Sequence, residues 1–339
     1  MSSTIEVLIT LPFPAELIQK IEQVSARLHV VSLRAGKPEE VPASAWEQVE
    51  VLYTDSVVPA PDQAPKLRWI QFHYAGLETV IDRPILARPG IVATSLSGAA
   101  ASQVAEYVLL MILALGHRLP DLIDHQDKAS WPADRWKRFS PQELRGSRIG
   151  LVGYGSIGRE VARLVHAFGG GILATKRDAK QPGDGGYIPE GMGDPPGDLV
   201  YRLYPPQALR SMLKECDFVV VAVPLTKATS GLIGAAELEA MKSTACLVDV
   251  SRGGIVDQTA LIAALRDHEI AGAALDVFAE EPLPADSPLW KFPNVIVTPH
   301  IAGISPQYDL RAFDLFAENL KRYLESRPLL NRFDLGRGY

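Results

Sequence analysis

The sequence has few of the features that mark secreted or membrane proteins. Only two of its 339 residues are cysteines, too few for a disulfide-built fold, and both Cys216 and Cys246 lie in apolar surroundings where we expect buried, reduced thiols. The longest apolar stretch, Val108 to Leu115, is far shorter than the roughly 18 residues of a membrane-spanning helix. No secretory signal or transit-peptide pattern is present. We therefore expect a cytoplasmic protein without a membrane segment.

Basic residues are also in deficit. The chain has 34 Lys and Arg against 40 Asp and Glu, which gives a net charge of −6. The composition therefore predicts no basic surface for binding nucleic acid. Hydrophobic residues make up 47% of the chain, enough at this length for two domains with cores of their own.

The strongest motif lies near the middle of the chain. An apolar run from Arg148 to Val152 is followed by Gly153, Gly155 and Gly158 and then by an amphipathic helical pattern. In a dinucleotide-binding turn the first glycine permits the tight turn, the second lets a pyrophosphate approach the backbone, and the third allows close packing of helix on strand. The helix N-terminus then attracts the phosphates. A purely structural glycine turn is the alternative.

The candidate cofactor residues of this turn are consecutive. They are Gly153, Tyr154, Gly155, Ser156, Ile157 and Gly158.

Short apolar runs alternate with helical patterns on both sides of this motif, which is typical of parallel sheets covered on both faces. In the N-terminal third we predict a helix from Pro14 to Leu28 and strands at 5–9, 30–33, 51–53, 67–72 and 91–94. After the glycine motif we predict strands at 148–152, 172–175, 218–223, 245–250, 272–277 and 295–297, and helices at 206–213, 237–241, 259–267 and 306–324.

Three connecting segments are distinctive. Ala101 to Arg118 should form a long helix that is apolar over much of its circumference and therefore buried on several sides. We expect no regular secondary structure from Asp121 to Leu144. Ala179 to Leu203 is rich in Gly, Pro and Asp, and it is too long for an ordinary loop, so we expect either disorder or a role near the cofactor.

Three strand ends of the second unit carry side chains that suit one reaction. Arg252, Glu281 and His300 each follow an apolar run, and the carboxyl ends of parallel strands meet at one edge of the sheet. A 2-oxo acid needs its carboxylate held and its carbonyl polarised, which the planar guanidinium of Arg252 suits. His300 suits the transfer of a proton to the new alkoxide oxygen.

A carboxylate on the other imidazole nitrogen would orient His300 and stabilise its charged form. Glu281 is the candidate, although Glu280 is adjacent and the residues alone do not separate the two. An ion pair at the surface remains the alternative for Arg252, and packing or surface positions are the alternative for the histidines.

The run from Arg148 to Gly303 closely resembles the D-isomer-specific 2-hydroxyacid dehydrogenase family. The matching motifs are Val152 to Gly158, Pro224-Leu225-Thr226, Val250 to Gly254, Leu275 to Pro282 and Thr298-Pro299-His300. The resemblance implies an α/β fold of two Rossmann-like, doubly wound parallel-sheet domains with the active-site cleft between them. The expected substrate-binding domain is 1–100 plus 304–339, and the expected dinucleotide-binding domain is 101–303, with 101–118 as a bridging helix. A homodimer is also implied.

The resemblance assigns residue roles. Arg252 would bind the substrate carboxylate and carbonyl, His300 would be the acid–base paired with Glu281, and Asp276 would contact the nicotinamide amide. Backbone N–H groups of Tyr74, Ala75 and Gly76 would cradle the substrate carboxylate. Further cofactor contacts are expected at Pro224 and Val250.

One position departs from the pattern of NAD-specific members. Where they carry an aspartate that binds the ribose hydroxyls, this chain has Lys176, followed by Arg177. Two cations should attract a 2′-phosphate, so we predict a preference for NADP(H), with NAD(H) possible. The alternative is that one or both side chains point to solvent.

The leading hypothesis is an NAD(P)-dependent oxidoreductase that acts on a small 2-hydroxy or 2-oxo acid, similar to a glyoxylate or hydroxypyruvate reductase. A second hypothesis is a dehydrogenase of the same scaffold that acts on phosphoglycerate or phosphite. A non-catalytic, nucleotide-sensing protein similar to the family's corepressors is a third. No metal is expected.

Overall fold

The computed structural model describes residues 4–338. The chain divides into two compact units, Met1–Ala99 with Ser305–Tyr339, and Ala100–Ile304. The domain bounds expected from the sequence lie within one residue of these. The two units are called unit 1 and unit 2 below, and each is described by itself.

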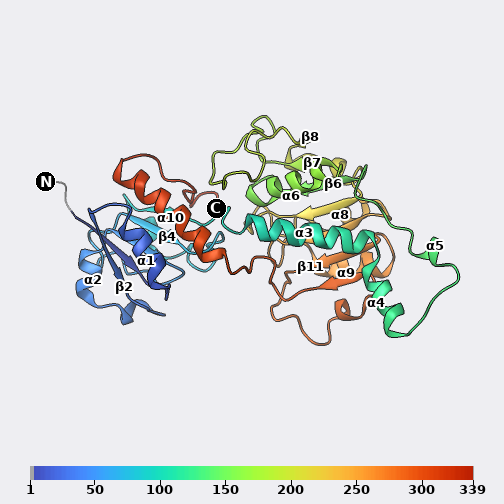
Figure 1. Ribbon diagram of the computed structural model, residues 1–339, viewed down its shortest axis with the longest axis horizontal. Coiled ribbons are helices and arrows are strands. Elements are labelled where there is room, and N and C mark those ends of the chain that lie inside the picture. The colour runs from blue at the N-terminus through green and yellow to red at the C-terminus, as the bar shows by residue number, and fades with distance from the viewer. Residues whose placement is uncertain (1–3, 339) are drawn as a thin grey trace. The chain divides into compact units, whose positions relative to one another are not determined.

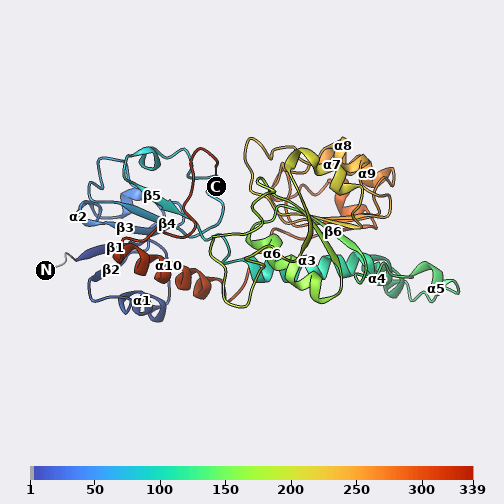
Figure 2. The same cartoon turned by 90° about the horizontal axis from the view of Figure 1, so that it is seen from above.

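Unit 1 is built on a five-stranded parallel sheet in the order β2-β1-β3-β4-β5. The strands are β1 (Ile5–Ile9), β2 (Leu28–Ser32), β3 (Val51–Thr54), β4 (Trp69–Phe72) and β5 (Val92–Thr94). The helices are α1 (Ala15–Glu22), α2 (Ala43–Gln48) and α10 (Tyr308–Leu324). Helix α10, the last helix of the chain, packs beside α1 on one face of this sheet (Figures 1 and 2). Unit 1 is therefore completed by a segment from the far end of the sequence.

Helix α1 ends at Glu22, which is earlier than the predicted bound at Leu28. Leu28 instead opens β2, where its side chain is 9% exposed and pairs in register with Ile5. The helical periodicity continued by chance into an apolar run whose partner, β1, is not local in sequence. Pairing with β1 overrides the local pattern.

Unit 2 holds a seven-stranded parallel sheet in the order β12-β11-β10-β9-β6-β7-β8. The strands are β6 (Arg148–Val152), β7 (Gly171–Thr175), β8 (Val200–Tyr204), β9 (Phe218–Val221), β10 (Cys246–Asp249), β11 (Gly272–Leu275) and β12 (Val295–Val297). Its central strands β9, β10 and β11 are buried at every residue. Such continuous apolar runs are what a sheet covered on both faces requires.

Helices cover both faces of the unit 2 sheet. One face packs against α3 (Ala101–Gly116) and α6 (Ser156–Ala167), and the other against α7 (Leu209–Leu213), α8 (Ala235–Glu239) and α9 (Gln258–Arg266), as Figure 2 shows. Cys216 and Cys246 are both buried in these cores. The doubly wound α/β class predicted from the sequence is confirmed for both units.

Two expectations for unit 2 were wrong. The stretch 121–144 is not irregular throughout, because it contains the end of α4 (Leu119–Asp127) and the short α5 (Arg135–Arg138). Neither helix has a buried residue, so the sequence carries no apolar period to reveal them. Strand β8 was also missed, because it is an edge strand with Tyr201 and Arg202 exposed.

Within residues 4–338 no helix is long and apolar enough to cross a membrane.

Candidate functional site

The glycine turn has the space that a dinucleotide pyrophosphate needs. Gly153 adopts φ +105°, and a Cβ there would lie 2.6 Å from the carbonyl oxygen of Ala222. A Cβ on Gly158 would overlap the carbonyl oxygen of Gly153. At Gly155, by contrast, a Cβ would have no heavy atom of the described residues within 4 Å, apart from the backbone next to it in the chain. Gly153 and Gly158 are therefore required by the packing of the fold, whereas Gly155 leaves space beside the backbone for a ligand.

The helix that begins at this turn is oriented for an anion. Gly155 is the N-cap of α6 and has no side chain to accept from the first-turn N–H groups. The partial positive charge of the helix N-terminus thus faces the open space beside Gly155. Gly153 N donates to Thr175 Oγ1 over 3.1 Å, which ties the turn to the last residue of β7. These residues fit a dinucleotide.

The imidazole of His300 is paired with a carboxylate. His300 Nδ1 lies 2.8 Å from Glu281 Oε2, and Glu281 Oε1 accepts from Phe278 N over 3.0 Å. The structure thereby distinguishes Glu281 from Glu280, which the sequence alone did not. Burial opposes ionisation of Glu281, but the hydrogen bonds from His300 and Phe278 and the charge of Arg252 outweigh it and lower the pKa of this carboxyl.

The backbone at His300 is strained. Its φ is +53°, in the left-handed region that costs a residue with a Cβ about 1 kcal/mol or more. Two backbone acceptors hold it there, since His300 N donates to Asp276 O over 2.9 Å and to Thr298 O over 3.1 Å. Strain maintained by surrounding hydrogen bonds is common at functional sites.

Asp276 holds the loop that carries His300. Its side chain is 1% exposed, and it accepts from Thr298 Oγ1 at 2.6 Å, Ile301 N at 2.9 Å and Ala302 N at 2.8 Å. Thr298 Oγ1 also lies 2.7 Å from the hydroxyl of Tyr107 on α3. This network was not predicted from the sequence, although a polar residue at the end of an apolar run was a signal for it. The predicted contact of Asp276 with the nicotinamide amide stays a prediction.

Arg252 lies in the turn after β10, next to the turn that carries Glu281. Its Nη1 donates to Ser251 O over 2.8 Å. A Cβ on Gly253 would overlap the carbonyl oxygen of Phe278, so only glycine lets the two turns pack this closely. Below them, burial raises the pKa of Asp249 to about 7, although Ser251 donates two hydrogen bonds to its carboxylate.

Pro224 and Val250 follow the carboxyl ends of β9 and β10. Val250 is buried, and its N–H group donates a hydrogen bond to Val221 O over 3.2 Å. Pro224 O accepts a hydrogen bond from Thr229 Oγ1 over 2.6 Å. Both lie at the same edge of the unit 2 sheet as the glycine turn, and their cofactor contacts stay predictions.

In unit 1, the predicted carboxylate cradle follows the carboxyl end of β4. Tyr74 and Ala75 are exposed, and Gly76 is partly exposed. His73, which precedes them, is buried and lies 2.8 Å from the hydroxyl of Tyr53 through Nδ1, and burial lowers its pKa. Tyr308 of α10 donates to His73 O over 2.8 Å. These hydrogen bonds hold His73, the residue before the predicted cradle, and the role of the three cradle residues stays a prediction.

Lys176 and Arg177 have different surroundings. Lys176 Nζ donates to the carbonyls of Gln181, of Pro182 at 3.3 Å and of Gly183 at 2.6 Å. Burial, and then the charge of Arg159, lower the pKa of Lys176. Arg177 is exposed beside it. The two cations that the sequence analysis grouped together are therefore not equivalent.

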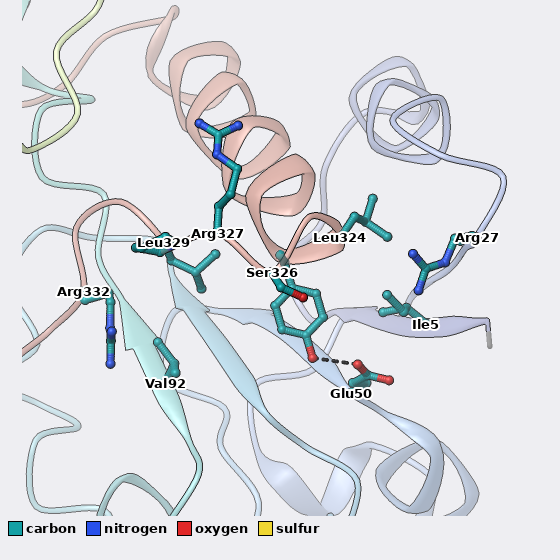
Figure 3. Close-up of a pocket in the computed structure, with 11 residues that line it drawn as sticks. Ile5, Arg27, Glu50, Val92, Leu324, Ser326, Arg327, Leu329 and Arg332 are labelled. Carbon is teal, nitrogen blue, oxygen red and sulfur yellow. Dashed lines mark hydrogen bonds between the residues drawn. The ribbon is translucent and has the colours of Figure 1, made fainter. Parts of the chain in front are cut away.

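A cavity of about 420 Å³ lies elsewhere in unit 1, at the amino ends of the strands, and contains none of the predicted site residues. In Figure 3 Arg27 and Arg332 stand on opposite sides of it, and a dashed line marks the 2.6 Å hydrogen bond from Tyr323 to Glu50. Within residues 4–338 no group of His, Cys, Asp and Glu side chains could hold a metal ion.

Comparison with known proteins agrees with this geometry. Residues 109–302 match the family model of the D-isomer specific 2-hydroxyacid dehydrogenase NAD-binding domain. Glyoxylate reductase from Aeropyrum pernix is 35% identical over 306 residues, 87% of each chain. D-3-phosphoglycerate dehydrogenase from Methanocaldococcus jannaschii is 31% identical over 94% of this chain but only 57% of its own length. A solved D-isomer specific 2-hydroxyacid dehydrogenase from Xanthobacter autotrophicus, in complex with NADPH and MES, has a TM-score of 0.81 and 28% identity over the whole of both chains.

Proposed function

The chain belongs to the D-isomer specific 2-hydroxyacid dehydrogenase family, and we propose that it is an NADPH-dependent reductase of small 2-oxo acids, with glyoxylate and hydroxypyruvate as the leading substrates. It is an oxidoreductase that transfers a hydride between a nicotinamide cofactor and a 2-hydroxy or 2-oxo acid. The 2.8 Å pair of His300 and Glu281, at the sheet edge that also carries the glycine turn, is the observation that carries the proposal.

The cofactor residues are those of the glycine turn. The open space at Gly155 takes the pyrophosphate, and the N-terminus of α6 stabilises its charge. Pro224, Val250 and Asp276 line the rest of the binding edge in this proposal. The bound nicotinamide supplies the hydride in the reductive direction.

Arg252 binds the substrate. Its planar group of N–H donors suits a 2-oxo acid, whose carboxylate and carbonyl oxygens lie in one plane. The positive charge polarises the carbonyl and stabilises the oxyanion that hydride addition creates. In unit 1, the backbone of Tyr74, Ala75 and Gly76 is proposed to bind the substrate carboxylate.

His300 moves the proton. Because Nδ1 is hydrogen-bonded to the ionised carboxylate of Glu281, Nε2 is the nitrogen that protonates the alkoxide oxygen. In the oxidative direction the neutral imidazole accepts the hydroxyl proton through the same nitrogen. Asp276 and the strained backbone at His300 keep the ring in place.

The choice of substrate and cofactor rests on relatives and on one side chain. Curated relatives named glyoxylate reductase are 35% and 36% identical over 87% and 79% of this chain. The structural relative from Xanthobacter autotrophicus is described as a complex with NADPH. In this chain Arg177 is exposed directly after Lys176, at the strand end that meets the adenosine ribose.

The test is steady-state turnover with both cofactors. The purified chain is given glyoxylate, hydroxypyruvate, 3-phosphohydroxypyruvate or no acid, and oxidation of NADPH or NADH is followed optically. We expect kcat/KM to be at least about tenfold higher with NADPH, which a single charged contact is large enough to provide. Faster turnover with NADH would overturn the cofactor assignment. Preference for the phosphorylated acid would favour a phosphoglycerate dehydrogenase.

Cofactor binding without turnover of any 2-oxo acid would favour a nucleotide sensor.

We also propose that the chain forms a homodimer through unit 2. Trp131 and Trp136 are 84% and 80% exposed, and the guanidinium of Arg135 lies over both rings. Leu122 and Ile123 of α4 are exposed as well, and α4 and α5 lie at one end of unit 2 in Figure 1. A second copy of the chain is the proposed occupant.

A further inference from the structure

The segment between β7 and β8 is attached to the cofactor end of unit 2 by buried polar groups. We call residues 178–199 the strap. It has no helix or strand of its own, and in both views it loops beside α6 (Figures 1 and 2). It is attached at the glycine turn and at the end of β7. These are the two places where a fold of this class binds the adenosine diphosphate part of a dinucleotide.

The first attachment is Arg159, the residue after Gly158. Its side chain is 0% exposed. The guanidinium donates to the carbonyls of Asp194 and Pro182, lies 3.3 Å from a carboxylate oxygen of Asp184, and stacks 4.4 Å from the ring centre of Tyr154. A charge this deeply buried needs close partners. The strap supplies two carbonyl acceptors for the Nη atoms and a carboxylate beside Nε, although Nε itself makes no hydrogen bond within the described residues.

The second attachment is Asp194, 4% exposed. It accepts from the hydroxyl of Tyr154 at 2.5 Å and from the N–H groups of Gly197, Asp198 and Leu199 at 3.0 to 3.2 Å. Tyr154 is the residue between the first two glycines of the turn. Its side chain therefore points into the strap attachment, and only its backbone remains for the cofactor.

The third attachment is Lys176. Its ammonium group donates to the carbonyls of three successive strap residues, Gln181, Pro182 and Gly183. An ammonium group has three N–H donors, so these carbonyls occupy all of them. A 2′-phosphate would have to displace them.

We propose that Lys176 is a positioning residue, which fixes the strap at the adenosine end of the cofactor site, and that Arg177 alone discriminates the 2′-phosphate. This rests on the proposed NADP(H) preference. Lys176 acts through the strap on the adenosine pocket that both cofactors share, so its loss weakens both. Arg177 acts through the phosphate that only NADP(H) carries, so its loss weakens one.

The experiment measures dissociation constants of the full-length protein for NADPH and NADH, and for 2′,5′-ADP and 5′-AMP, by calorimetry. Lys176→Met should weaken all four nucleotides by a similar factor, about tenfold for the loss of charged hydrogen bonds. Arg177→Ala should weaken NADPH and 2′,5′-ADP by about tenfold and leave NADH and 5′-AMP within twofold. Lys176→Arg should recover most of the lost affinity, and the exposed Lys214→Met controls for net charge.

Limited proteolysis reports on the strap itself. Lys176→Met should increase the rate of cleavage within 178–199 several-fold. Gly197→Ala provides a second variant that leaves every charge in place. Gly197 has φ +82°, and a Cβ there would lie 2.7 Å from Pro182 O. It should loosen the strap and reproduce the equal loss of both cofactors, while kcat at saturating cofactor stays within a few-fold.

A selective loss of NADPH and 2′,5′-ADP in Lys176→Met, with NADH unchanged, would make Lys176 a phosphate ligand and overturn the proposal. No change in any nucleotide would overturn it as well. If the unmodified protein binds 2′,5′-ADP no better than 5′-AMP, the NADP(H) preference fails. The equal-loss result for Lys176→Met still decides the role of the strap.

Discussion

At the scale of single residues, the proposed catalysis depends on how His300 is held. Glu281 fixes one nitrogen of the ring at 2.8 Å, and Arg252 contributes to keeping Glu281 ionised. The three side chains come from turns after three neighbouring strands, β10, β11 and β12. Removing one therefore changes the electrostatic environment of the other two.

We expect His300→Ala and Arg252→Ala each to lower kcat/KM for 2-oxo acid reduction by at least about 10³-fold, since each removes a group that acts in the transition state. The dissociation constant for NADPH should stay within about threefold, because neither residue belongs to the glycine turn. Stopped-flow reduction and cofactor titration on the same samples measure both quantities. A loss of less than tenfold in His300→Ala would contradict its role.

Glu281 gives the reaction a pH dependence with a defined sign. Its pKa in the folded protein is lowered, so the His300 pairing is present above the ordinary carboxyl range and is lost as pH falls through this lowered value. Glu281→Gln removes the counter-charge of the imidazolium. The alkaline fall of kcat/KM for reduction should then move to lower pH. A profile unchanged from the parent enzyme would show that Glu281 does not support the proton transfer, and Glu280→Gln is the matched control.

At the scale of elements, the β6–α6 turn separates a structural glycine from a binding glycine. A Cβ at Gly158 overlaps Gly153 O, whereas a Cβ at Gly155 meets no described heavy atom within 4 Å. Gly158→Ala should therefore lower Tm by several degrees. Gly155→Ala should keep Tm and weaken NADPH binding at least about tenfold, because the methyl group enters the pyrophosphate space. Thermal unfolding and cofactor titration distinguish the two variants, and the opposite pattern would contradict this reading.

The loop after β12 depends on Asp276 in a comparable way. Asp276→Asn replaces one acceptor oxygen with an amide donor, opposite N–H groups that also donate. We expect kcat to fall about 10- to 100-fold, because the His300 loop loses charged hydrogen bonds. Thr298→Val removes a single partner and should have a smaller effect in the same direction. Equal kcat in Asp276→Asn and the parent would exclude this positioning role.

At the scale of the whole molecule, unit 2 contains the glycine turn, the proposed acid–base pair and Arg252, and unit 1 contains the predicted carboxylate cradle. The exposed tryptophans of the α4–α5 region belong to the proposed dimer surface. The double variant Trp131→Glu with Trp136→Glu should shift the molar mass measured by light scattering after size exclusion from dimer to monomer, because two charges would be desolvated in each half. Tyr201→Glu, at an exposed aromatic of β8, is the control. A monomeric parent protein would rule the dimer out.

The features that the sequence predicted well are those with a local cause. Continuous apolar runs predicted the buried strands, and the glycine spacing predicted the tight turn between β6 and α6, because a tight turn and a helix N-terminus are properties of neighbouring residues. Arg252 and His300 were singled out because each follows an apolar run that the sequence predicted to be a strand. Edge strand β8 and helices α4 and α5 could not, because they bury too little apolar surface to leave a periodic pattern.

Only the tertiary structure decided which polar groups meet. Glu281 rather than Glu280 reaches His300. Asp276 bonds a loop 25 residues away along the chain. Lys176 and Arg177 are identical in sign and adjacent in sequence, yet the strap binds the ammonium of one and leaves the other exposed. Hydrogen bonds of this kind depend on distance and direction between segments far apart in the chain, which composition and spacing do not contain.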